Sequence, residues 1–500
     1  MTYLIPVAVI ILFLVLLFVR EMLNERKRRR QFRQSLYDKF GQLPDKKITP
    51  EREQHIPGYY RRHSKTEQLD DITWNDLSMD DIFRRMNYTH SATGEEYLYY
   101  LLRTPVKDTE QLEHLEDVIG WLWDNPDERV DLQVNLSELG YTGKHSLYDY
   151  IENLDELGKR GNLKHYLADA LYIPFIILLP FQTALALFGI SALGVYQIVT
   201  YFKDKGQMEP YIISFAYITR LIKGCEKIGK MQIPVCEKEI NELRECVRAL
   251  KGIKSGSFWI FTASNSRTSG NPLEVIMDYL RMVFHVDLII FNKMLRQLKA
   301  HVKDVDTLIT NAGFLESAAS VCWLRASMKE GFCVPEFDTG NASLIDIKEG
   351  YHLLLEQPVK NSILASGGVL LTGSNASGKS TFLKMTAINA VLAQTVHTCA
   401  ADAYRGSYYS IYSSMSLRDN IESGESYYIV EIKALKRILD AVKAGERVLC
   451  FVDEVLRGTN TVERIAASTE ILKSLGAGET VCFAATHDIE LTELLSSDFD

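Results

Sequence analysis

The chain has 500 residues, of which 46% are hydrophobic and 24% charged. This length exceeds the roughly 250 to 300 residues at which one hydrophobic core stops growing, so it predicts two or three folded parts, and the composition leaves little room for long disorder. The net charge of -9 gives no general basic surface for nucleic acid, so any such contact must use a local patch. The eight cysteines form no C-x-x-C pair, which favours buried thiols in a reducing compartment over zinc ligation or disulfides.

An apolar stretch near the start of the chain is followed by a run of cations. The stretch, residues 4–19, contains one proline and no charge. The cations after it are Arg20, Arg26, Lys27, Arg28, Arg29, Arg30 and Arg33. Because a cleaved signal peptide carries its basic residues before the apolar stretch, this order predicts an uncleaved anchor with the downstream chain in the cytoplasm. We therefore interpret residues 1–19 as a transmembrane anchor in the cell membrane and residues 20–63 as a basic linker.

A second apolar stretch covers residues 171–202. It exceeds the ~20 residues that one crossing of a bilayer needs. Cations on both flanks, among them Lys164 and Lys203, favour an even number of crossings, since both flanks then stay in the cytoplasm. Residues 166–202 are thus predicted to form a membrane hairpin of two short helices that turns near residues 181–189. A single span and a hairpin buried in a soluble core are the alternatives.

Helical periodicity dominates two further regions. Residues 64–165 predict a helical core module, in which Thr93 and Glu96 have the spacing of a capping box. Residues 203–340 predict long helices that act as levers. A set of cations in this region is a candidate for phosphate contacts with DNA, against the alternative of a solvated helix face: Lys223, Lys227, Lys230, Arg244, Arg248, Lys251 and Lys254.

A phosphate-binding loop is the strongest motif of the chain. Residues 369–371 have the pattern of a buried strand, and a G-x-x-x-x-G-K-[ST] sequence follows them and opens an apolar helical run. In such a loop the backbone amides bind phosphates, the lysine reaches the β- and γ-phosphates of ATP, and the next hydroxyl ligates Mg2+. The nucleotide-binding residues predicted here are Gly373, Ser374, Asn375, Ala376, Ser377, Gly378, Lys379, Ser380 and Thr381, with Ser380 as a magnesium ligand.

Two further apolar strands end in residues with catalytic chemistry. Residues 448–452 lead into Asp453 and Glu454, and residues 481–485 lead toward His487. Because ligands of parallel α/β sheets bind at the carboxyl ends of the strands, these side chains are expected beside the phosphate-binding loop. We predict that Asp453 holds Mg2+, that Glu454 orients or deprotonates the attacking water, and that His487 senses the γ-phosphate.

Four motifs follow one another in the C-terminal third. They are Thr372-Gly373-x-Asn375-x-x-Gly378-Lys379-Ser380-Thr381, Ser423-Gly424-Glu425-Ser426-Tyr427-Tyr428-Ile429-Val430-Glu431, Asp453-Glu454-x-x-Arg457-Gly458-Thr459-Asn460-Thr461, and Ala485-Thr486-His487. Together they resemble the ATPase domain of the MutS mismatch-repair family. The resemblance implies a dimer in which Ser426, Arg457 and Asn460 act across the interface, and it places Gln394 near the nucleotide. For Ser426, a plain helix cap is the alternative.

The fold class implied is an α/β P-loop ATPase domain of the ABC type over residues 341–500, with an all-α core and lever region and membrane helices. The chain departs from the family in three places. The Phe-x-Glu wedge that family members insert into DNA has its one counterpart at Phe314 and Glu316, inside a predicted core helix, where packing is the better interpretation. Ser414 stands where the family has a loop arginine. The sequence ends at Asp500 without the family's helical tail, so we expect either a longer chain or a dimer held elsewhere.

The favoured hypothesis is a membrane-anchored, homodimeric ATPase that uses ATP and Mg2+ to clamp DNA, mismatched or branched, without the domain that reads mismatches. The alternative is an ATP-driven switch that acts on a protein or on the membrane. A transporter ATPase is disfavoured, because the LSGGQ-type signature is absent.

Overall fold

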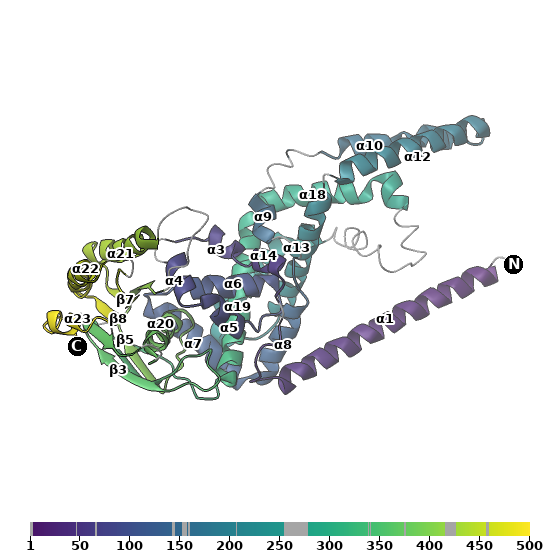
Figure 1. The fold of residues 1–500 in the computed structure, drawn as a ribbon. Coiled ribbons are helices and arrows are strands. Elements are labelled where there is room, and N and C mark those ends of the chain that lie inside the picture. The colour runs from purple at the N-terminus through teal and green to yellow at the C-terminus, as the bar shows by residue number, and fades with distance from the viewer. Residues whose placement is uncertain are drawn as a thin grey trace.

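The computed structural model describes residues 4–500 except 47, 66–67, 143–145, 153–157, 159–160, 207, 255–278, 339, 341, 375–376, 416–426 and 457–459. Two β-sheets and their helices lie at one end of the molecule, a helical body lies in the middle, and the long helix α1 and a helical hairpin project from the body (Figure 1). The predicted ATPase domain is therefore far from the two apolar segments.

A parallel sheet carries the predicted catalytic motifs. Its strand order is β4-β8-β7-β6, and all neighbouring pairs are parallel. In this register Thr372 lies opposite Thr486, and Asp453 lies opposite Ala485, so the ends of three strands meet at one edge. The strands are β4 (Gly368–Thr372), β6 (Ser410–Ser414), β7 (Val448–Asp453) and β8 (Val481–Thr486), and the helices of this domain are α20 (Lys379–Val396), α21 (Tyr427–Lys443), α22 (Thr461–Leu475) and α23 (Glu490–Leu494).

The strands of a second, mostly antiparallel sheet lie before and after β4 in the sequence. Its order is β1-β5-β2-β3, with β1 (Glu336–Phe337), β2 (Ile345–Gly350), β3 (Asn361–Ala365) and β5 (Ala403–Gly406). The turn between β2 and β3 lies beside the phosphate-binding loop, because residues of both line one cavity.

The helical body is centred on α19 (Val302–Ser327), which is buried along most of its length. Leu315 and Glu316 are buried and the Phe314 ring stacks on His114 at 5.5 Å, which agrees with packing rather than a wedge. The other helices are α4 (Asp71–Asp76), α5 (Met79–Met86), α6 (Ala92–Arg103), α7 (Thr109–Asp124), α8 (Pro126–Ser137), α9 (Leu147–Glu152), α13 (Glu209–Ile228), α14 (Glu237–Ala249), α15 (Lys251–Lys254) and α18 (Val286–Ala300).

The capping box expected at Thr93 is wrong. Helix α6 begins two residues earlier, and Ser91 is its N-cap, with Ser91 Oγ accepting from the Gly94 amide at 3.0 Å. The Thr93 hydroxyl instead contacts the Tyr217 hydroxyl inside the body at 2.5 Å. Serine and threonine are both favoured at an N-cap, and the tertiary contact of Thr93 decides between the two positions.

The segment expected to be a linker is built into the helical body. Helix α1 (Leu4–Asp38) continues through the basic run, and α2 (Pro50–Glu53) and α3 (Gly58–Arg62) follow it. The physical reason is that acidic partners on and after α8 receive the cations: Arg33 pairs with Asp131, and Arg29 lies 3.4 Å from Glu138. The basic run therefore fastens α1 to the body.

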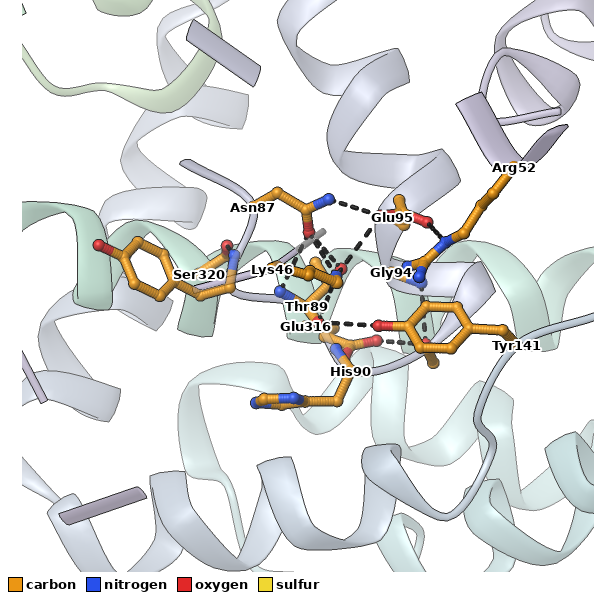
Figure 2. Close-up of polar contacts among 12 residues, drawn as sticks. Lys46, Arg52, Asn87, Thr89, His90, Gly94, Glu95, Tyr141, Glu316 and Ser320 are labelled. Atoms are coloured by element: carbon orange, nitrogen blue, oxygen red, sulfur yellow. Dashed lines mark hydrogen bonds and ion pairs between the residues drawn. The ribbon is translucent and has the colours of Figure 1, made fainter. Parts of the chain in front are cut away.

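Lys46 and Arg52 extend this attachment into the interior (Figure 2). Lys46 Nζ donates to Asn87 Oδ1 at 2.9 Å and to the Thr89 carbonyl at 2.7 Å, and it lies 3.4 Å from Glu95. Arg52 Nε donates to the other oxygen of Glu95 at 2.6 Å. Because loss of one partner from a buried ion pair typically costs about 3–5 kcal/mol, these contacts hold the N-terminal segment firmly to α6.

Glu96, next to Glu95, is predicted to make stability depend on pH. Its carboxyl accepts from the Tyr59 amide and the Ser146 hydroxyl, and burial raises its pKa to about 8 despite these bonds. Because the folded protein keeps a proton that the unfolded chain releases, this contribution to the free energy of unfolding is complete below about pH 4.5 and is lost as the pH rises to about 8. Urea unfolding of Glu96→Gln should therefore show a smaller loss of stability across this window than the wild type.

The control for that prediction is Glu113→Gln, because Glu113 is exposed on α7. It should keep the wild-type pH dependence. An unchanged pH dependence in Glu96→Gln would contradict the prediction.

The second apolar stretch forms a helical hairpin that projects from the body (Figure 1). It consists of α10 (Leu163–Ala170), α11 (Tyr172–Leu178) and α12 (Thr183–Gly206), so the turn begins slightly before the predicted position and α12 is longer than expected. The alternative of a hairpin buried in a core is wrong, because large apolar side chains are exposed along it: Leu171, Ile173, Ile176, Ile177, Phe181, Leu185, Leu187, Phe188, Val195, Tyr196, Val199 and Phe202. Within the part of the chain that the structure describes, α12 alone is long and apolar enough to cross a membrane by length and composition.

Candidate nucleotide-binding site

The phosphate-binding loop lies between β4 and α20, as the sequence predicts. Gly378 has φ +93°, a left-handed conformation that favours glycine, and α20 begins at the next residue. Lys379 Nζ donates to the carbonyls of Gly373 at 2.7 Å and Ser374 at 3.1 Å. Its ammonium is thus held at the mouth of the loop, where phosphate oxygens would replace the carbonyl contacts. Asn375 and Ala376 lie outside the described residues.

A cavity of about 520 Å3 opens beside this loop. It has the size of a small-molecule site and combines apolar walls with a few polar groups. From the predicted set, it is lined by Gly373, Ser377, Gly378, Lys379 and Thr381. Sequence reasoning missed its other wall, which the turn after β2 and the side of α20 supply: His352, Leu355, Gln357, Val359, Phe382 and Met385.

The two predicted magnesium ligands lie together. Ser380 Oγ donates to Asp453 Oδ2 at 2.5 Å, although 73 positions separate them in sequence. The pairing arises because β7 ends with Asp453 at the sheet edge where α20 starts. A hydroxyl and a carboxylate oxygen beside a phosphate loop are the donor set that Mg2+ prefers, so these residues fit the ion.

The predicted catalytic pair is also in contact. His487 Nε2 lies 2.8 Å from Glu454 Oε1, and the Glu454 amide donates to the Ala485 carbonyl at 2.9 Å. Glu454 has φ +56°, an unfavourable conformation for a residue with a Cβ atom. Both side chains are partly exposed and line a cavity of about 260 Å3, so water has access to the carboxylate.

Arg464 and Asp488 form a part of this second cavity that sequence reasoning missed. The Arg464 guanidinium binds both oxygens of Asp488, at 2.9 and 2.6 Å, and Asp488 directly follows His487. This bidentate pair ties α22 to the loop after β8. No motif pointed to it, because the partners are 24 positions apart in sequence.

The structure places Gln394 inside the core, far from the phosphate-binding loop, which corrects the prediction. The side chain is fully buried, and its amide exchanges hydrogen bonds of 3.0 Å with the amide and carbonyl of Tyr409. Fifteen positions of α20 separate it from Lys379, about 22 Å along a helix axis. Gln394 therefore holds α20 against the segment before β6.

The residues predicted to act across a dimer interface are only partly described. Ser426 and Arg457 lie outside the described residues. Asn460 is the N-cap of α22, where its Oδ1 accepts from the Glu463 amide at 3.0 Å. Within a single copy of the chain, Asn460 thus serves as a helix cap.

The cations predicted as candidates for DNA contacts are engaged within the body in three cases. Lys227 pairs with Glu138, Lys230 lies 4.0 Å from Glu226, and Arg244 Nε donates to the Gly229 carbonyl at 2.6 Å. This agrees better with a solvated helix face whose charges are locally paired.

The predicted ATPase domain is joined to the helical body through α4 and β6. Asp76 is buried and accepts from the Ser413 hydroxyl at 2.7 Å and from the Met415 amide at 2.9 Å. Arg437 of α21 bonds Asp70 and the Ser413 carbonyl. Helix α4 thereby holds both the end of β6 and the middle of α21.

Comparison with known proteins agrees with this site. Residues 369–499 match the family model described as MutS domain V. MutS protein homolog 4 of Mus musculus is 29% identical over 231 residues, which are 44% of this chain and 23% of that protein. DNA mismatch repair protein MutS of Thermus aquaticus is 33% identical over 175 residues, which are 34% of this chain and 21% of that protein. The chain thus matches less than a quarter of the length of these relatives.

Proposed function

From the similarity of its C-terminal part to the MutS family, we propose that the chain binds ATP with Mg2+ and hydrolyses it in a site that a second copy completes. The observation that carries this proposal is the convergence of Lys379, Ser380, Asp453, Glu454 and His487 at one edge of the parallel sheet. These are the groups that phosphoryl transfer to water needs: a phosphate cradle, an ion site and a carboxylate with access to water.

The proposed roles follow from the contacts. Lys379 exchanges its loop carbonyls for phosphate oxygens, and Ser380 and Asp453 would hold Mg2+. When bound, Mg2+ neutralises charge that develops on the phosphate oxygens. Glu454 orients a water molecule and takes its proton, and His487, 2.8 Å away, fixes the direction of that carboxylate.

The test is Mg2+-dependent ATP hydrolysis by the full chain in detergent, beside Lys379→Ala. The wild type should turn over ATP, and the variant should lose nucleotide binding and turnover because the phosphates lose their main cation. Equal turnover in both proteins would contradict the assignment of the phosphate-binding loop. A stability measurement on both proteins separates this result from misfolding.

Similarity to these relatives favours DNA as the molecule on which the chain acts. The relative from Thermus aquaticus is named a DNA mismatch repair protein, and it matches this chain over 175 residues. We propose that ATP-driven closure of a homodimer clamps DNA through the helical body.

A second candidate function, an ATP-driven switch at the cell membrane, is favoured by the hairpin. Helix α12 has 24 residues, about 36 Å of helix, and about 30 Å of apolar length matches a bilayer core. Its last turn carries Lys203 and Lys205, and Lys164 at the base of α10 lies beside Asp204. Charges at the base with apolar side chains around the tip suit a bilayer, with the soluble domains in the cytoplasm. Helix α1 projects from the same side of the body (Figure 1), and we propose that it enters the same membrane.

A further inference from the structure

We propose that Glu431 is a positioning residue for the catalytic loop, and this inference rests on the proposed ATPase function. Glu431 lies in α21 and is 2% exposed. Its Oε1 accepts a hydrogen bond from the Leu456 amide at 2.6 Å, across 25 positions of sequence. Leu456 comes two residues after Glu454. The side chain thus acts on the loop that carries the predicted catalytic carboxylate through the backbone of Leu456.

The backbone of this loop needs such support. Glu454 and Leu456 have φ values of +56° and +57°, and left-handed conformations are unfavourable for residues with a Cβ atom. They persist where surrounding contacts fix them, which is typical of active sites. The Ala485 carbonyl fixes the Glu454 amide at 2.9 Å, and Glu431 fixes the Leu456 amide. Without the second contact, the loop is free to relax toward ordinary φ values and to turn the Glu454 carboxylate away from His487.

The position of Glu431 also links the loop to the rest of the molecule. Arg437, six residues further along α21, bonds Asp70 of α4 and the carbonyl of Ser413. One helix therefore contacts the catalytic loop with one side chain and the helical body with another. A displacement of the body relative to the sheet is transmitted through α21 to the direction of Glu454.

The experiment compares Glu431→Ala with Glu431→Gln, which keeps an oxygen acceptor for the Leu456 amide. In nucleotide-free protein, hydrogen exchange of the peptide that contains Leu456 should be about tenfold faster in Glu431→Ala and unchanged in Glu431→Gln. For ATP hydrolysis, Glu431→Ala should lower kcat by about 100-fold with an unchanged KM, because the carboxylate is misdirected while the phosphate loop is intact. Glu431→Gln should restore kcat.

Asp440→Ala is the matched control, because it removes an exposed carboxylate from the same helix. It should leave both kcat and the exchange at Leu456 at wild-type values. Exchange and kcat at wild-type values in Glu431→Ala, with the wild type active, would overturn the inference. A wild type that fails to hydrolyse ATP would overturn the proposed function instead, and the exchange comparison would still test the contact.

Discussion

Glu454→Gln is expected to bind ATP with Mg2+ at wild-type affinity and to hydrolyse it about 100- to 10,000-fold more slowly. The substitution preserves the size of the side chain and an oxygen toward His487, but an amide takes no proton from water. Lys379, Ser380 and Asp453 are untouched, so the phosphates keep their contacts. Single-turnover hydrolysis and equilibrium nucleotide binding measure the two effects separately. Normal hydrolysis would show that another group is the base.

Glu470→Gln is the control for this variant, since Glu470 is exposed on α22. It should behave as the wild type.

The Glu454→Gln protein, which is expected to keep ATP bound, also distinguishes between the two proposed functions, a DNA clamp and a switch at the membrane. Its binding to homoduplex, mismatched and branched DNA is measured across a salt series. A steep loss of affinity with salt would support phosphate contacts and the clamp, and a preference for mismatches would mean that another segment replaces the missing wedge. If the ATP-bound variant did not bind DNA even at low salt, the switch at the membrane would be favoured.

The parallel sheet and the edge that gathers the candidate site residues were predictable because their signals are local. Continuous apolar runs that end in Asp453 and Thr486 specify buried parallel strands, and the parallel arrangement brings their ends together. The contacts of Ser380 with Asp453 and of Glu454 with His487 follow from that geometry. For these side chains, the residue type and the position at the end of a strand were sufficient to predict where they lie.

Contacts between distant segments were not predictable in this way. Glu431 fits a family motif, but its contact with Leu456 depends on how α21 packs over the loop. The wall of the nucleotide cavity comes from a turn with no periodic pattern. The prediction for Gln394 was wrong because a resemblance gives only the order of residues along the chain. In the structure, α20 carries this side chain about 22 Å from the phosphate-binding loop. The basic run within α1 is polar by composition, and its acidic partners on and after α8 decide that it packs.

The double variant Phe188→Asp with Val195→Asp is expected to keep the hairpin out of the bilayer. These side chains are 73% and 63% exposed on α12, and an aspartate near the centre of a membrane helix costs about 2.5–3.5 kcal/mol. Because α1 is also proposed to enter the membrane, the readout must report the hairpin alone. We would place a fluorophore at Ser191→Cys, reconstitute the full chain in vesicles and measure quenching by brominated lipid acyl chains.

In the otherwise unchanged chain the fluorophore should be quenched, and in the double variant quenching should be lost. Val462→Asp is the matched control, since Val462 is 79% exposed on α22 in the ATPase domain, and it should leave quenching unchanged. A fluorophore that is unquenched before any aspartate is introduced would contradict membrane insertion. The apolar hairpin would then need a protein to cover it, because water is a poor solvent for so many adjacent exposed apolar side chains.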